Sequence, residues 1–177
     1  MANYSADAST EAELKISAGA MVAKSARLSG KISLGEGTVV HPFAVIRADR
    51  APIHLGHNNI VEEGALIENV DPSGEPMRIG SENVFEVQCV VRAKSIGNNN
   101  SIQVQADLKQ GAQIANGCSI GPRCVVPEDD VLPDRTVIYG GDNKRRIAHE
   151  NPPSSLDDCE TLRKILPTYH KMHQPNA

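Results

Sequence analysis

The sequence predicts an all-β solenoid of parallel coils, followed by a C-terminal α-helix. Three observations lead to this fold class. Large aliphatic residues recur at every sixth position, small residues follow them at a fixed offset, and the interruptions of the period fall at one point of the repeat. The composition agrees, because a chain with three Tyr, two Phe and no Trp must build its core from stacked aliphatic side chains.

The six-residue period covers residues 16–132. A short strand followed by a turn fits this spacing, whereas a plain helix or an isolated alternating strand does not. Three such units make one coil, and stacked coils pair their strands in parallel at a spacing of about 4.8 Å. The predicted inward positions are Ile16, Val22, Leu28, Leu34, Val40, Ile46, Leu55, Val61, Ile67, Ile79, Phe85, Val91, Ile96, Ile102, Leu108, Ile114, Ile120, Val126 and Leu132.

Breaks in the period gather at one place in the predicted coil. Two breaks are insertions, around DRAPIH (49–54) and VDPSGEPM (70–77), and a third shortens the repeat after residue 91. Each follows the third unit of a coil, so we expect all three at one corner of a three-sided prism. The predicted coils begin at Ile16, Leu34, Leu55, Ile79, Ile96 and Ile114.

Small residues occupy the fourth position after most inward marks, and this pattern explains the two cysteines of CSIGPRC (118–124). Cys118 and Cys124 take the slot that alanine fills in other units. The pattern therefore favours core packing over a metal clip or a disulfide. Cys159 lies outside the repeat.

The grouping by coils also aligns a glycine column and an asparagine column. Both residue types tolerate left-handed backbone angles, so we expect them at the sharp corners. Stacked asparagine amides can also hydrogen-bond along the column. The columns are Gly35, Gly56, Gly80 and Gly97, and Asn59, Asn83 and Asn100.

The sequence divides into a flexible N-terminus (1–15), a β-helix (16–141), a linker (142–154), a C-terminal helix (155–173) and a tail (174–177). Ser155 and Asp158 match a capping box, and Pro167 is expected to kink or end the helix. Helical spacing predicts a face toward the β-helix made of Leu156, Cys159, Leu162, Ile165, Leu166 and Tyr169.

Charge and hydropathy exclude several classes of function. The net charge of −4 argues against binding to nucleic acid or anionic membranes, and no apolar run is long enough for membrane insertion. The polar start, MANYSADASTEAELK, lacks the apolar stretch of a secretory signal, which predicts an intracellular, reducing location. We therefore expect the basic cluster of Lys144, Arg145 and Arg146 to be a solvated rim.

The hexapeptide pattern resembles that of left-handed parallel β-helix proteins. This resemblance implies a left-handed parallel β-helix of hexapeptide repeats with a C-terminal α-helix. Proteins with this repeat include acyltransferases, γ-class carbonic anhydrases and catalytically silent scaffold subunits. The chain matches the Arg-x-Asp of the γ-class enzymes with Arg47 and Asp49.

The three zinc-binding histidines of the γ-class enzymes are replaced in this sequence. Their positions hold Glu68, Val87 and Arg92. Valine has no donor atom, a guanidinium repels a divalent cation, and zinc needs three or four N, O or S ligands. We therefore expect no metal site of that kind, no catalytic residues and no cofactor.

The remaining histidines leave one alternative open. His54 and His57 lie near the first insertion at a spacing of three. They could bind a metal on a turn or supply a general base to an acyltransferase, although a corner histidine is usually only solvated. The alternative function is thus a carbonic-anhydrase-like or acyltransferase enzyme with relocated ligands.

Four segments resemble the dynactin subunit 6 family: NNIVEEGALI (58–67), IGSENVFEV (79–87), TVIYGGDNKRR (136–146) and LRKILPTYHKMH (162–173). The resemblance implies a non-catalytic, cytoplasmic and cytoskeletal subunit of the dynactin pointed-end complex. Its implied partners are dynactin subunit 5, dynactin subunit 4 and the pointed-end actin-related protein, and its implied role is support of dynein-driven microtubule transport and cargo binding. Arg145, Arg146 and Tyr169 are the candidate partner-surface residues.

Overall fold

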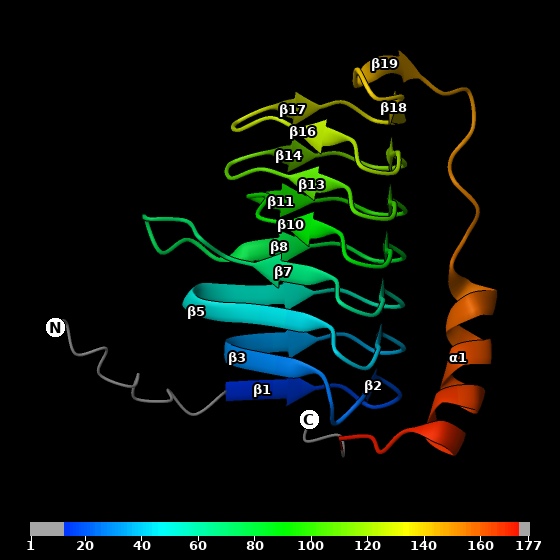
Figure 1. Ribbon diagram of the computed structural model, residues 1–177. Coiled ribbons are helices and arrows are strands. Elements are labelled where there is room, and N and C mark those ends of the chain that lie inside the picture. The colour runs from blue at the N-terminus through cyan, green and yellow to red at the C-terminus, as the bar shows by residue number, and fades with distance from the viewer. Residues whose placement is uncertain (1–12, 174–177) are drawn as a thin grey trace, which may run out of the picture.

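The computed structural model describes residues 13–173 and is a left-handed parallel β-helix with one α-helix alongside it (Figure 1). The predicted fold class is confirmed. No helix within residues 13–173 combines the length and apolar character needed to cross a membrane.

The coils form a prism with three faces. Backbone pairing joins the first and third faces into one sheet, because β3 and β5 run across the corner between them. The first face contains β1 (Glu13–Ile16), the ends of β3 (Arg27–Leu34) and β5 (Val45–Leu55), β8 (Met77–Ile79), β11 (Ser95–Ile96), β14 (Gln113–Ile114) and β17 (Val131–Leu132). The third face contains the beginnings of β3 and β5, β7 (Leu66–Glu68), β10 (Val90–Val91), β13 (Asp107–Leu108) and β16 (Val125–Val126).

The second face is a separate sheet. Its strands are β2 (Met21–Val22), β4 (Val39–Val40), β6 (Ile60–Val61), β9 (Val84–Phe85), β12 (Ser101–Ile102), β15 (Ser119–Ile120), β18 (Thr136–Tyr139) and β19 (Lys144–Ile147). All its neighbouring strands are parallel except β18 and β19, which are antiparallel.

The predicted period is confirmed by the register of the first face. Ile16, Leu34, Leu55, Ile79, Ile96, Ile114 and Leu132 lie one above another. Every predicted inward residue is buried except Leu28, which is partly buried and packs against the core. The irregularities also lie at one corner, as expected. The 49–54 insertion continues strand β5, whereas residues 70–76 form a loop that projects from the prism (Figure 1).

The expected left-handed backbone angles are wrong for both the glycine column and the asparagine column. Residues with left-handed φ angles instead lie directly before the asparagine column, at Asn58, Glu82 and Asn99. Gly80 belongs to a column that is needed for close approach instead. A Cβ atom at Gly80 would lie 2.6 Å from the carbonyl oxygen of Gly97 in the next coil, closer than any real contact of this kind.

The asparagine column is confirmed as a hydrogen-bonded ladder. The side-chain amide of Asn83 donates to Asn59 Oδ1 (3.0 Å), and that of Asn100 donates to Asn83 Oδ1 (2.9 Å). Thr38 precedes this ladder and Cys118 follows it, because the backbone N–H of Cys118 donates to Asn100 Oδ1 (2.7 Å). Cys89, Cys118, Cys124 and Cys159 are free and buried, in agreement with core packing.

The boundaries of the terminal segments need correction. Strand β1 begins at Glu13, inside the N-terminus expected to be flexible, and residues 1–12 and 174–177 lie outside the described residues. The expected linker 142–154 contains β19, since the chain turns back and pairs with β18.

Helix α1 (Leu156–Tyr169) differs from the expected helix in its cap and its contact face. Ser155 makes no capping bond, because its hydroxyl donates to the backbone oxygen of Asn58 in the prism (3.2 Å). The helix continues through Pro167, which removes only one helical hydrogen bond so close to the end. Of the six residues expected to face the β-helix, only Cys159 and Leu166 are buried, while Leu156, Ile165 and Tyr169 are exposed and Leu162 is partly buried. The contact is narrow because α1 lies along a corner of the prism.

Candidate functional site

Charged side chains form a column on the third face. The column includes Glu68 and Arg92, two of the three positions compared above with the zinc ligands of γ-class carbonic anhydrases. The Arg92 Nε donates to Glu68 Oε2 at 3.0 Å, and Arg47 Nη1 lies 3.7 Å from Glu68 Oε1. The strands β5, β7 and β10 stack these residues in successive coils. A single carboxylate is therefore held between two guanidinium groups.

This arrangement does not fit a zinc ion. Both carboxylate oxygens of Glu68 already face cations, and neither Val87 nor Arg92 can donate an electron pair to a metal. Within residues 13–173, no group of three or more His, Cys, Asp or Glu side chains could hold a metal ion. Asp49, the other residue of the Arg-x-Asp motif, is exposed and accepts a hydrogen bond from Ser29 (3.0 Å).

The two histidines near the first insertion do not converge. His54 lies on the first face, and its Nδ1 atom is 2.6 Å from the Ser33 hydroxyl. Partial burial, followed by the charges of Arg78, Lys31 and Lys15, lowers the pKa of His54. His57 is exposed and lines a shallow pocket with Glu36, Asn58 and Arg163. No shared metal site follows from this placement.

The sequence does not indicate that His41, a buried histidine in a turn, has a structural role. His41 Nδ1 lies 2.9 Å from Glu63 Oε1, between the turns of adjacent coils. Partial burial raises the pKa of Glu63, but the hydrogen bond from His41, a backbone hydrogen bond and the nearby histidines together outweigh burial, so the net pKa is lowered. The pair fixes the turn that carries Phe43, whose side chain is 66% exposed. The order His-Pro-Phe alone does not reveal this contact.

The candidate partner-surface residues are separated by the structure. Arg145 and Arg146 lie on β19 at the last coil, and Arg145 forms an ion pair with Asp130. Tyr169 lies at the opposite end, just before the segment that pairs with the first coil through Lys24 and Lys171 (2.8 Å) (Figure 1). These three residues therefore cannot form one contact patch.

The last coil is closed against the addition of another strand. Strand N–H groups elsewhere donate to the following coil, but Pro127 and Pro133 have no N–H at two of these positions. The N–H of Val125 donates to the side chain of Asn143 (2.8 Å), and β19 covers β18. Such features prevent edge-to-edge pairing.

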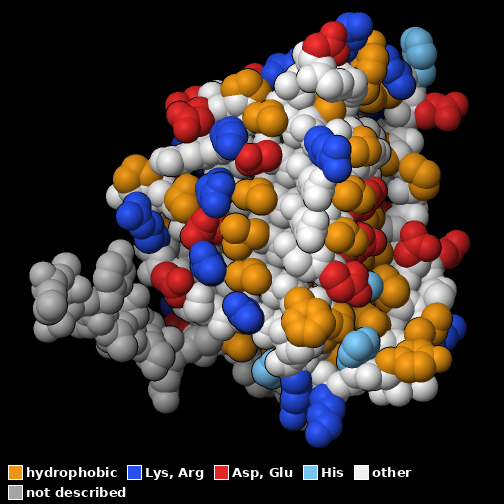
Figure 2. All heavy atoms as spheres, in the orientation of Figure 1, with side chains coloured by type: hydrophobic (Ala, Val, Ile, Leu, Met, Phe, Trp, Pro, Cys, Tyr) orange, Lys and Arg blue, Asp and Glu red, His pale blue; other side chains and the backbone are white. Residues whose placement is uncertain are grey.

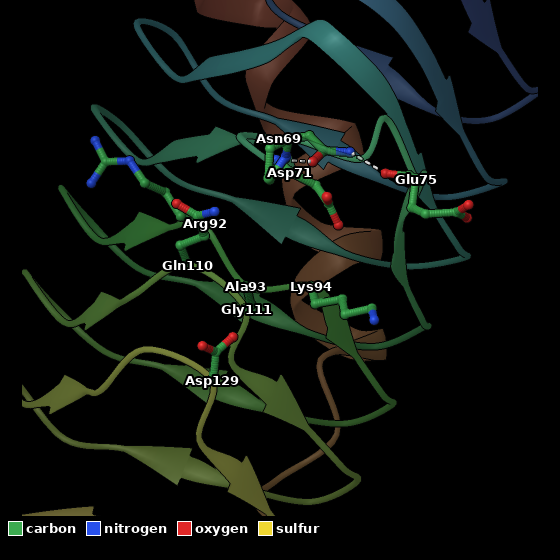
Figure 3. Close-up of a pocket in the computed structure, with 10 residues that line it drawn as sticks. Asn69, Asp71, Glu75, Arg92, Ala93, Lys94, Gln110, Gly111 and Asp129 are labelled. Atoms are coloured by element: carbon green, nitrogen blue, oxygen red, sulfur yellow. Dashed lines mark hydrogen bonds between the residues drawn. The ribbon is translucent and has the colours of Figure 1, made fainter.

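The corner with the projecting loop contains a polar cavity of about 220 Å³ (Figure 3). Asn69 anchors the loop, because its amide donates to the backbone oxygens of Pro52 and Glu75, each at 3.0 Å. Asp71, Asp129, Arg92 and Lys94 line the cavity with mixed charge. Its lining contains neither histidine nor cysteine.

Comparison with known proteins identifies sequence relatives of this chain and a solved structure with the same fold. No protein-family model matches the chain. Dynactin subunit 6 of Danio rerio is 40% identical over 182 residues, which cover 97% of this chain and 93% of that protein. A carbonic anhydrase of Methanosarcina thermophila is 30% identical over 105 residues, covering 57% of this chain and 41% of that protein. A hexapeptide transferase family protein from Anaplasma phagocytophilum shares the fold, with a TM-score of 0.74, 14% identity and coverage of 90% of this chain and 95% of that chain.

Proposed function

Because the chain belongs to the dynactin subunit 6 family, we propose that it is a non-catalytic structural subunit of the dynactin pointed-end complex. In this proposal it pairs with dynactin subunit 5 and lies near dynactin subunit 4 and the pointed-end actin-related protein. It supports dynein-driven microtubule transport and cargo binding in the cytoplasm, at the cytoskeleton.

The ion-paired carboxylate of Glu68 is the observation that carries the non-catalytic part of the proposal. A zinc hydratase generates its nucleophile by lowering the pKa of a metal-bound water. The guanidinium group of Arg92 occupies one of the matching ligand positions, is bonded to Glu68 at another, and would repel the metal. Charge and ligand chemistry at this face therefore favour a structural role.

The shape of the prism supports a role in assembly. Its strands are fixed by ladders in both directions, and its core is continuous from Ile16 to Ile138. A rigid surface loses little conformational entropy on binding, so more of the contact energy remains as affinity.

Co-purification tests the proposal directly. The full chain, tagged and expressed at its natural level, should recover dynactin subunits in fixed ratio when quantified by mass spectrometry. A variant with Ile114→Asp, which disrupts the core, serves as the matched control and should recover none. Absence of all dynactin subunits from the parent's eluate would contradict the proposal.

One observation favours an enzymatic alternative, the contact between His54 and Ser33 at 2.6 Å. A histidine with a lowered pKa can act as a base toward a hydroxyl group. We expect the purified chain to show neither carbon dioxide hydration nor acetyl transfer from coenzyme A. Turnover that disappears with His54→Gln would establish the alternative instead.

A further inference from the structure

Phe43 is an exposed aromatic side chain in an unusual backbone conformation. It is one of two phenylalanines in the chain, its side chain is 66% exposed, and its φ angle is 62°. A bulky residue with a left-handed φ angle is uncommon and costs conformational energy. The fold does not require a ring here, because the same corner slot in the following coils holds Gly64, Gln88, Gln105 and Arg123, with φ angles of 68°, 59°, 58° and 58°.

The turn fixes the backbone of Phe43. Pro42 is buried and limits the backbone before Phe43, while the N–H of Ala44 donates to the carbonyl oxygen of His41 at 3.3 Å. The side chain of His41 is bonded to Glu63 in the next coil. An exposed aromatic group on a fixed backbone loses little backbone freedom on binding, which suits a binding hot spot.

An apolar stripe on the third face continues from this ring. Val45, Leu66 and Val90 are stacked in register on successive strands, point outward and are only partly buried. In Figure 2, which looks onto this face, hydrophobic side chains form a stripe beside a column of charged ones. The stripe and the ring together make a flat apolar surface with a projecting anchor.

The border of the stripe on the side away from Phe43 has the opposite charge to the whole protein, whereas Glu63, bonded to His41, lies on the side of the ring. The outward positions of the third face include the cations Arg27, Arg47, Arg92 and Lys109 and the anions Glu68 and Asp107, a surplus of two cations, on a chain of net charge −4. A partner with carboxylates at its edge would complement this border. A second copy of this chain would instead bring the same cationic surplus to the contact.

We propose that Phe43 and the stripe of Val45, Leu66 and Val90 form a docking surface for another protein subunit. That subunit offers an apolar pocket to the ring and acidic side chains to Arg27 and Arg47. The inference rests on the proposed assembly role and specifies which face of the prism performs it.

The experiment compares tagged full-length parent and Phe43→Asn, using dynactin in the same cells as the probe. Asparagine tolerates the left-handed φ angle, so the purified variant should unfold at the parent's temperature or above. It should recover at least about tenfold less dynactin, as expected when a hot-spot residue is lost. Gln105→Asn, in the same corner slot three coils away, is the control and should recover as much as the parent.

Charge reversal provides an independent variant. Arg27→Glu should reduce recovery, whereas Arg78→Glu on the first face should not. Parent-level recovery by Phe43→Asn would overturn the docking surface while leaving the proposed function intact. Failure of the parent itself to recover dynactin would instead reject the proposed function and this inference with it. A homodimer in light scattering that Phe43→Asn dissociates would show that the occupant is a second copy and overturn the proposal.

Discussion

Arg92 Nε lies 3.0 Å from Glu68 Oε2 in the preceding coil, so the two side chains form an ion pair on the third face. The Glu68 side chain is 22% exposed and that of Arg92 is 34% exposed, so water screens the pair only in part. The contact links the neighbouring strands β7 and β10 across successive coils.

A double-mutant cycle of Glu68→Gln and Arg92→Ala measures this contact. We expect a coupling of about 0.5–1 kcal/mol, because partly exposed ion pairs rarely contribute more. Urea denaturation at low and high salt gives the values, and the coupling should weaken in high salt. A coupling that is zero at low salt would show that the two groups act independently.

The asparagine ladder predicts a larger effect. Asn83 is fully buried, and its Oδ1 atom accepts from both the backbone and side-chain nitrogen atoms of Asn100, each at 2.9 Å. Asn83→Ala leaves these donors unpaired, which should cost about 3 kcal/mol or more. Asn116→Ala is the control, since Asn116 makes similar bonds on the exposed surface and should cost less than about 1 kcal/mol. Equal losses for the two variants would contradict the role of burial.

The glycine column gives a third test. Gly80→Ala would place a Cβ atom 2.6 Å from the backbone oxygen of Gly97, so the coils must separate locally. A loss of about 1–3 kcal/mol in the free energy of unfolding is expected, as for overpacked sites. Gly141→Ala meets no atom within 4 Å and should change stability by less than about 1 kcal/mol. A neutral Gly80→Ala would contradict the close-approach explanation.

The buried cysteines predict a loss of stability in alkali. Burial, with added repulsion from Glu62 and Glu86, raises the pKa of the Cys89 thiol in the folded state. Its unfolded pKa is about 8.5, so the stabilising contribution is complete below that pH and falls as pH rises. From pH 7.5 to 9.5 this thiol alone should remove about 1.4 kcal/mol. Cys89→Ala, which matches the stacked Ala65 and Ala106, should reduce the measured pH dependence by that amount; an unchanged dependence would contradict the assignment.

The sequence predicts the prism well because stacking repeats one physical requirement. Every inward position must be apolar to fill a continuous column, and every corner must admit a tight turn, so a few residue types recur at fixed spacing. The amide ladder of Asn59, Asn83 and Asn100 follows from the same register.

The features that the sequence did not reveal depend on single contacts. Ser155 matches a helix cap by its spacing, but its hydroxyl donates to Asn58, almost one hundred residues away in the chain. The exposure of Ile165 and Tyr169 likewise follows from the placement of α1 along a corner. Hydrophobic periodicity describes one helix at a time and cannot locate the surface that receives it.

The last test places a charged residue in the core and so examines the six-residue repeat. Ile114 is 3% exposed and lies between Ile96 and Leu132 in the column of the first face. Ile114→Asp places a carboxylate where no partner can reach it, and we expect a loss of more than about 4 kcal/mol. Gln113→Asp changes the adjacent outward residue of the same strand, so its cost should stay near or below about 1 kcal/mol. Thermal unfolding followed by circular dichroism measures both variants, and similar melting temperatures would mean that the inward and outward positions have been exchanged.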